Sequence, residues 1–86
     1  MPFHINILTP EKQVFEGELS SLIVPAALGY LGVLSNHAPL VANLIPGKII
    51  YKEARGNEAV IKNTGKGFIE VTNNKATILL DSVLLT

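Results

Sequence analysis

The sequence predicts an all-β domain, a β-sandwich or barrel built from short strands. Turn signals rich in Gly, Pro and Asn recur roughly every 8–10 residues, which is the spacing typical of such folds. Between them, apolar and polar residues alternate with the period of a half-buried strand, as in Phe3-His4-Ile5-Asn6-Ile7. The longest segment without Gly or Pro, 68–86, is rich in Val, Ile and Thr and is interrupted by Asn73-Asn74, so it favours a hairpin over a helix.

Each predicted strand is bounded by a recognisable turn. Thr9-Pro10-Glu11-Lys12, Pro46-Gly47 and Arg55-Gly56-Asn57 are typical turn sequences. Asn73-Asn74 suits a two-residue turn that requires positive φ. Residues 82–86 form either a last short strand or a frayed end. The predicted strands are residues 3–7, 13–17, 19–24, 33–34, 40–45, 48–53, 58–63, 68–72 and 75–80.

The stretch from Ile23 to Ile45 organises the rest of the chain. It predicts a strand that turns at Pro25, a loop shaped by glycines, a short strand, a tight Ser35-Asn36-His37 corner and a further strand. His37 is its only group that can carry a charge. An apolar, tightly bent segment of this kind has few groups that could take part in catalysis, but it suits docking on another protein.

Composition sets limits on the function. The 86 residues are expected to form one domain, 1–86, with 48% hydrophobic and only 16% charged residues. A formal net charge of zero leaves no basic footprint for nucleic acid, and the absence of Cys excludes disulfides and thiolate metal sites. No apolar run approaches the ~20 residues of a membrane span, and no signal peptide is visible, so we expect no direct membrane insertion.

No constellation of residues indicates catalysis, a cofactor or a metal. The carboxylates fall in turns or on the polar phase of strands, and Glu16 and Glu18 are interpreted as charges that discourage edge pairing. His4 and His37 lack the spacing of zinc ligands. Ser35 and His37 have no acid to complete a nucleophilic site. Gly65-Lys66-Gly67 departs from the phosphate-loop pattern and predicts a loop or bulge between strands.

The order of residues in the organising stretch resembles the epsilon subunit of F-type ATP synthase. That family reads V-P-x-x-x-G-x-x-G-V-L-x-x-H-A-P-L. Here the pattern is carried by Val24-Pro25, Gly29 to Leu34 and His37-Ala38-Pro39-Leu40. The match keeps its order over nearly the whole chain, with flanking agreement at Thr9-Pro10-Glu11, Val14-Phe15, Leu44-Ile45-Pro46-Gly47, Gly67 to Val71 and Thr77 to Asp81.

The resemblance implies a flattened β-sandwich of about ten short strands and a non-catalytic rotor-stalk subunit without a cofactor. Such a subunit binds the gamma subunit, rests on the ring of c-subunits and couples proton-driven rotation to ATP synthesis. It lies peripherally at the cytoplasmic face of the bacterial inner membrane. By resemblance, the gamma side is Thr9, His37, Ala38, Pro39 and Leu40. The uncharged tip predicted to face the c-ring is Leu28, Gly29, Tyr30 and Leu31.

The chain departs from the family in several places. It stops where family members usually continue into two helices, so either the natural protein ends here or the sequence is a piece of it. Tyr30 stands where many relatives have Glu, Ser35-Asn36 replaces a frequent Pro-Gly, and Lys66-Gly67 replaces paired glycines. The alternative function is a free-standing β-sandwich module for a small ligand, which the small number of aromatic residues disfavours. An enzyme is the third alternative.

Overall fold

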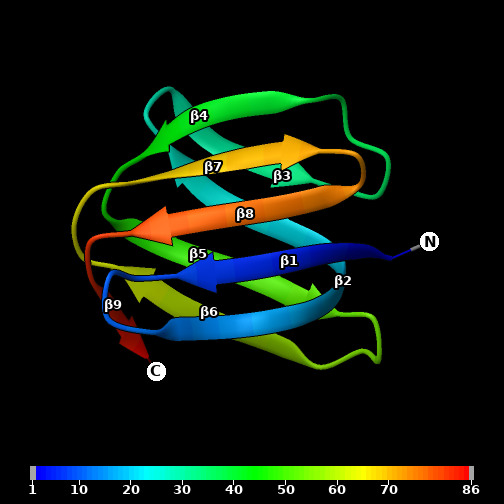
Figure 1. The fold of residues 1–86 in the computed structure, drawn as a ribbon, viewed down its shortest axis with the longest axis horizontal. Coiled ribbons are helices and arrows are strands. Elements are labelled where there is room, and N and C mark those ends of the chain that lie inside the picture. Colours follow the sequence, from blue (N-terminus) through cyan, green and yellow to red (C-terminus); the bar gives the residue numbers. More distant parts are fainter. Residues whose placement is uncertain (1, 86) are drawn as a thin grey trace.

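The computed structural model describes residues 2–85 and shows nine strands and no helix in that range. The all-β prediction is therefore confirmed. Figure 1 shows the strands arranged in two layers. The strands are β1 Phe3–Leu8, β2 Gln13–Ala26, β3 Gly29–Val33, β4 Leu40–Leu44, β5 Gly47–Glu53, β6 Glu58–Asn63, β7 Gly67–Thr72, β8 Lys75–Leu80 and β9 Val83–Leu85.

The layers are joined by the longest strand. One layer holds β4, β7, β8 and β1, and the other holds β3, β2, β5, β6 and β9 (Figure 1). The first half of β2 pairs with β1, whereas its second half pairs with β5 on one edge and β3 on the other. All pairs are antiparallel except β1 with β8. The result is a sandwich that β2 closes on both sides, because the last residue of β2, Ala26, also pairs with Leu44 of β4.

The strand β2 corrects two sequence-based predictions. Strands 13–17 and 19–24 are one continuous element, and the chain passes through Pro25 before it turns. Gly17 belongs inside the strand because the Phe15 ring lies over it, only 3.0 Å from where a Cβ would sit. Pro25 lies beyond the last β2–β5 pair at Ile23, so its missing N–H removes no bond from that ladder.

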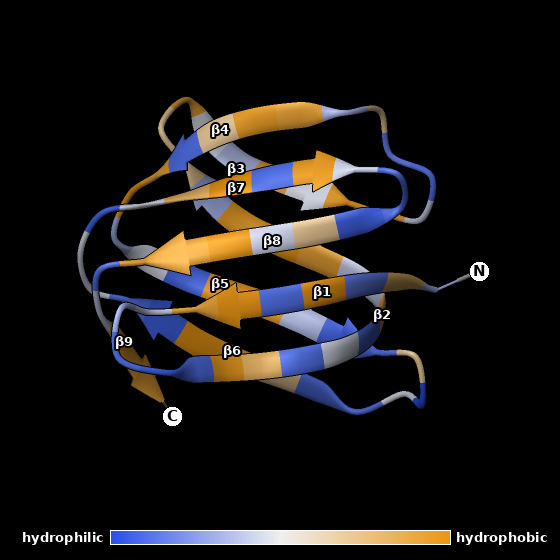
Figure 2. Cartoon of the chain, viewed as in Figure 1, coloured by the Kyte–Doolittle hydropathy of each residue, from blue (hydrophilic) through white to orange (hydrophobic). Residues whose placement is uncertain are grey.

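The core lies between the layers, and the alternation read from the sequence decides which side chains enter it. Figure 2 shows hydrophobic and hydrophilic residues alternating along β1 and β7. In β1 the odd-numbered side chains are buried and the even-numbered ones face outward. Phe15 adds a stacked contact with Tyr51, with ring centroids 4.7 Å apart. The core comprises Phe3, Ile5, Ile7, Leu19, Leu22, Val24, Ala26, Val33, Leu44, Ile49, Tyr51, Ile61, Ile69, Val71, Ala76, Ile78 and Leu80.

The turns follow the sequence closely. Asn73 and Asn74 have φ of 51° and 59°, as a two-residue hairpin turn requires, so that prediction is confirmed. The last segment contains β9, which pairs with β6, so residues 83–85 form a short strand rather than a frayed end. Thr86, the end of the predicted tail, lies outside the described residues.

Candidate docking surfaces

The structure places the predicted gamma-side residues at two ends of one layer. Thr9 follows β1 at the Leu80 end of β8, because β1 and β8 are parallel and Leu8 pairs with Leu79. The His37 corner, defined here as residues 34–39, contacts Asn74 at the opposite end of β8. A strand of this length spans roughly 17–20 Å. Thr9 and His37 are therefore not neighbours but flank the same surface.

The surface between them carries a row of apolar side chains. We call it the outer face and define it by Leu8, Val41, Phe68 and Leu79. Strand register aligns Phe68 with Leu79 and Leu79 with Leu8. Val41 lies further along β4 and is 69% exposed, while Phe68 and Leu79 are 37% and 39% exposed. Leu8, Leu79 and Phe68 therefore form an uncharged apolar row across β1, β8 and β7, whereas Val41 on β4 lies beside this row and pairs with Glu70.

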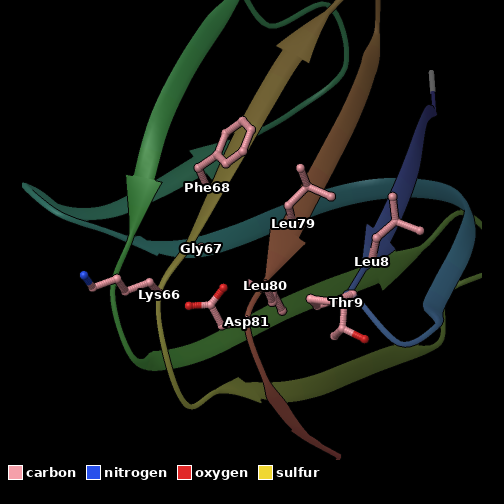
Figure 3. A pocket seen from close by; sticks show the side chains of 9 residues that line it. Leu8, Thr9, Lys66, Gly67, Phe68, Leu79, Leu80 and Asp81 are labelled. Carbon is pink, nitrogen blue, oxygen red and sulfur yellow. The ribbon is translucent and has the colours of Figure 1, made fainter.

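A shallow depression of ≈ 530 Å³ opens beside this row, next to Thr9 (Figure 3). In Figure 3 the side chains of Phe68, Leu79 and Leu8 follow one another across β7, β8 and β1. Lys66 and Asp81 line its border. The outer face therefore combines an apolar centre with one cation and one anion at its edge, an arrangement common to protein interfaces.

The His37 corner is a closed turn with exposed residues after it. The N–H of His37 donates to the carbonyl oxygen of Leu34 at 3.2 Å. The Nδ1 of His37 lies 2.8 Å from the carbonyl oxygen of Ala38. Ala38 and Pro39 are exposed, whereas Leu40 is half-buried and packs against the core. The corner thus offers a rigid small surface, with Leu40 anchoring it from below.

The predicted ring-side tip is the turn between β2 and β3. Leu28 is fully exposed there, and Tyr30 is 64% exposed. Tyr30 and Gly29 belong to β3 rather than to a loop, and Leu31 packs against the core. Gly29 has φ of 127°, a region that glycine alone enters without strain. The tip thus presents one apolar and one aromatic side chain on a stiff hairpin.

One open groove brings residues of both predicted surfaces together. It has a volume of ≈ 580 Å³ and runs between the tip and β4. Leu28 to Leu31 line one side and Leu40 to Asn43 line the other. The two predicted surfaces therefore meet at the β4 edge of the molecule.

An ionic cluster that the sequence reading missed joins β1 to β2. The two ring nitrogens of His4 each lie 3.0 Å from a carboxylate oxygen, one of Glu16 and one of Glu18. An ionised carboxylate only accepts hydrogen bonds, so both bonds form together only when the His4 ring is protonated and donates from both nitrogens. Glu18 and then Glu16 raise the pKa of His4 above its usual 6.5. The His4 bond, and next that of Gln13, lowers the pKa of Glu16.

This cluster adds a role for the two glutamates that the sequence interpretation did not include. Residues 13–18 of β2 pair with β1 on one edge only, so the interpretation that Glu16 and Glu18 discourage edge pairing stays a prediction. The signal was present in the sequence: a hairpin centred on the Thr9–Lys12 turn places His4 opposite Glu18 and Asn6 opposite Glu16. The cluster fixes the register of this hairpin and offers no open coordination or catalytic position.

The residues considered for chemistry are separated or occupied. Ser35 Oγ donates to Asn74, while the His37 ring bonds to its own neighbour. Lys66 lies in the turn between β6 and β7, and its carbonyl oxygen accepts from the N–H of Asp81 at 2.9 Å. Residues 2–85 contain no grouping of three or more His, Asp or Glu side chains that could hold a metal. Nor does this range contain a helix long and apolar enough to cross a membrane.

Comparison with known proteins gives one consistent result. A profile described as the ATP synthase, Delta/Epsilon chain, beta-sandwich domain matches residues 2–86. The ATP synthase epsilon chain of Dichelobacter nodosus is 42% identical over 80 residues, covering 93% of this chain and 55% of that protein. The ATP synthase epsilon chain of Chlorobaculum tepidum is 41% identical over 81 residues, covering 94% of this chain and 91% of that protein.

Solved structures share the fold at low sequence identity. A chain in the cryo-EM structure of the Euglena gracilis mitochondrial ATP synthase (OSCP/F1/c-ring) matches with a TM-score of 0.90 and 16% identity, covering 98% of this chain and 53% of that one. A chain in the central stalk/c-ring structure from Tetrahymena thermophila has a TM-score of 0.77 and 18% identity, with coverages of 94% and 64%. This chain spans 55% and 59% of the relatives from Dichelobacter and Leptospira interrogans.

Proposed function

Because the chain belongs to the ATP synthase delta/epsilon-chain family of β-sandwich domains, as its resemblance predicted, we propose that it is a non-catalytic subunit of the central stalk. In this role it binds the gamma subunit and the c-ring and couples proton-driven rotation to ATP synthesis. It works without a cofactor, as part of a membrane-associated complex at the cytoplasmic face of the bacterial inner membrane. The family match over 2–86 is the observation that carries the proposal.

The gamma side of the proposal extends from Thr9 to the His37 corner across the outer face. The proposal is based on the apolar row of Leu8, Leu79 and Phe68. Leu79 and Phe68 are exposed and Leu8 is half-buried, on a domain too small to bury all its apolar side chains. Ala38 and Pro39 form the exposed end of the corner, and Leu40 follows it at the start of β4. A partner that covers the row removes apolar area from water, and the border charges of Lys66 and Asp81 stay available for orientation.

The ring side of the proposal is the tip formed by Leu28, Gly29, Tyr30 and Leu31. The tip is uncharged, and its two outward side chains project from a hairpin in which β3 pairs along its whole length with the end of β2. Tyr30 Oη lies near Gly47, where an added Cβ would be 3.4 Å from it. The ring of Tyr30 therefore has a defined place, as an interface anchor requires.

The alternative proposal of a small-ligand module has less support. Ligand pockets are generally enclosed and carry a few convergent polar groups. The two hollows at residues 8–10 with 66–68 and 79–81, and at 26–31 with 40–43, are open and mainly apolar. Co-purification separates the two proposals, because a stalk subunit travels with gamma and a ligand module does not.

The gamma side can be tested with a matched pair of charge insertions. Leu79→Glu places a charge in the outer face, and Ile23→Glu places a charge on the opposite layer. The two side chains have nearly the same exposure, 39% for Leu79 and 40% for Ile23. Titration of each variant with the gamma subunit should show weakening of about tenfold or more for Leu79→Glu only. Equal affinities for both variants and the parent would contradict the gamma-side proposal.

The ring side is tested by Tyr30→Ala. The side chain is 64% exposed, so its truncation should leave the melting temperature unchanged. Anchors at interface centres commonly cost ~2 kcal/mol or more when truncated, so assembly with the gamma–ring complex should weaken while binding to gamma alone persists. Undiminished assembly of the folded variant would place the ring contact elsewhere.

A further inference from the structure

The His37 corner is held by a side chain from a distant part of the chain. The Oδ1 of Asn74, in the turn between β7 and β8, accepts a hydrogen bond of 2.7 Å from the backbone N–H of Asn36. The hydroxyl of Ser35 donates to the same oxygen at 3.4 Å. We propose that Asn74 positions the corner for docking on its partner. This inference rests on the proposed function of the corner.

The other contacts of Asn74 fix its amide in one orientation. Its Nδ2 donates to the carbonyl oxygen of Pro2 at 3.1 Å. Because a peptide N–H only donates and a carbonyl only accepts, the bonds to Asn36 and Pro2 require the same assignment of amide nitrogen and oxygen. The backbone carbonyl of Asn74 also accepts from the N–H of His4 at 3.2 Å. One residue thus joins the corner to the start of β1 and to its own turn.

The bond to Asn74 selects one of two possible conformations of the corner. Residues 34–37 form a β-turn closed by the bond between His37 N–H and Leu34 O. Asn36 has φ of 62° while Ser35 is not in the positive region, which is the pattern of a type II turn. A type I turn keeps the closing bond but flips the peptide between Ser35 and Asn36, which points the Asn36 N–H to the other side. The Asn74 bond exists only in the type II form.

An outside contact is needed because positive φ is disfavoured for a residue with a side chain. Asn tolerates this region better than most residues, but it does not prefer it over the right-handed one. The hydrogen bond to Asn74 stabilises the conformation in which Asn36 has positive φ. A corner held in one form presents His37, Ala38 and Pro39 in a fixed arrangement, so binding does not have to order them. Without the bond, apparent affinity falls with the fraction of molecules in the competent form.

The test compares two glycine substitutions in one turn. Asn73 and Asn74 both have positive φ, so Gly suits either position. The Asn73 side chain makes no hydrogen bond within residues 2–85, which makes Asn73→Gly a matched control for Asn74→Gly. In the full chain, the Asn36 amide should exchange with solvent about fivefold faster in Asn74→Gly, and affinity for the gamma subunit should fall by about fivefold. Asn73→Gly should change neither. Asn74→Gly should melt at a lower temperature than Asn73→Gly, because it also loses the side-chain bonds to Asn36 and Pro2, so both affinities are compared well below the melting range.

A double-mutant cycle with His37→Ala shows whether Asn74 acts through the corner. If it does, Asn74→Gly adds little to the loss of affinity already caused by His37→Ala. Equal Asn36 exchange in both glycine variants would show that the bond has no effect. Faster exchange with parent-like affinity in Asn74→Gly, while His37→Ala still weakens binding, would overturn the positioning role. If Asn74→Gly and His37→Ala both bind gamma like the parent, the corner is not the docking site. That result would overturn the positioning role of Asn74 and also the part of the proposed gamma side that includes the corner.

Discussion

Replacing Gly67 with Ala tests the closest approach between two strands beneath the outer face. Gly67 pairs with Leu80, and an added Cβ would lie 2.6 Å from the carbonyl oxygen of Leu79 and 2.7 Å from Cδ2 of Leu80. Neither neighbour moves easily, because one is ladder backbone and the other is a buried core side chain. Overpacking of this kind costs ~1–3 kcal/mol. For a domain of this size, each kcal/mol lowers the melting temperature by about 4–8 °C.

Gly32→Ala is the matched control for this substitution. Gly32 also lies in a strand, has no positive φ, and has no atom within 4 Å of the position of an added Cβ. Ala there should be neutral or stabilise the fold by about 0.4–1 kcal/mol through the unfolded chain. Thermal and urea unfolding should therefore show a lower midpoint for Gly67→Ala than for the parent, and an unchanged or higher midpoint for Gly32→Ala. A Gly67→Ala variant as stable as the parent would refute the described β7–β8 contact.

Two further predictions concern stability. Because the pKa of His4 is raised on folding, protonated His4 stabilises the fold fully below pH 6.5, and this contribution is lost as the pH rises through the folded pKa. Because the pKa of Glu16 is lowered on folding, ionised Glu16 stabilises the fold fully above pH 4.5, and this contribution is lost as the pH falls through the folded pKa. The advantage of the parent over His4→Phe in urea unfolding should therefore be largest between pH 4.5 and 6.5, and a pH-independent difference would contradict the cluster. Asn63→Ala removes a donor 2.9 Å from the Ile45 carbonyl oxygen and an acceptor for Gly65 N–H. It should cost ~1–3 kcal/mol, and an unchanged unfolding midpoint would show that these bonds contribute nothing.

The sequence was sufficient for most of the fold because local signals agree with it. The alternation of Phe3, Ile5 and Ile7 identifies the buried face of β1, and the bounds of β6 and β8 match the predicted ones. Asn73-Asn74 forms the expected turn because few other residues accept positive φ. Periodicity and turn chemistry are local properties, and this fold places its turns where those properties change.

The remaining features depend on contacts between distant residues. Gly17 and Pro25 look like strand breaks in sequence, but the Phe15 ring fills the space over one, and the other lies past the end of a ladder. The bond from Asn36 to Asn74 joins residues 38 positions apart, and no local pattern indicates it. The outer face also required the register of β7, β8 and β1, since Phe68, Leu79 and Leu8 form a row only after pairing.

Hydroxyl-radical footprinting of the chain alone, with gamma, and with gamma plus the c-ring tests the proposed two-surface function most directly. Phe68 and Leu79 are partly exposed and should lose reactivity when gamma is added. Leu28 and Tyr30 should lose reactivity only when the ring is present, and Ile23 on the opposite layer should stay reactive throughout. Protection of Ile23 by gamma, with Phe68 and Leu79 as reactive as in the free chain, would contradict this account.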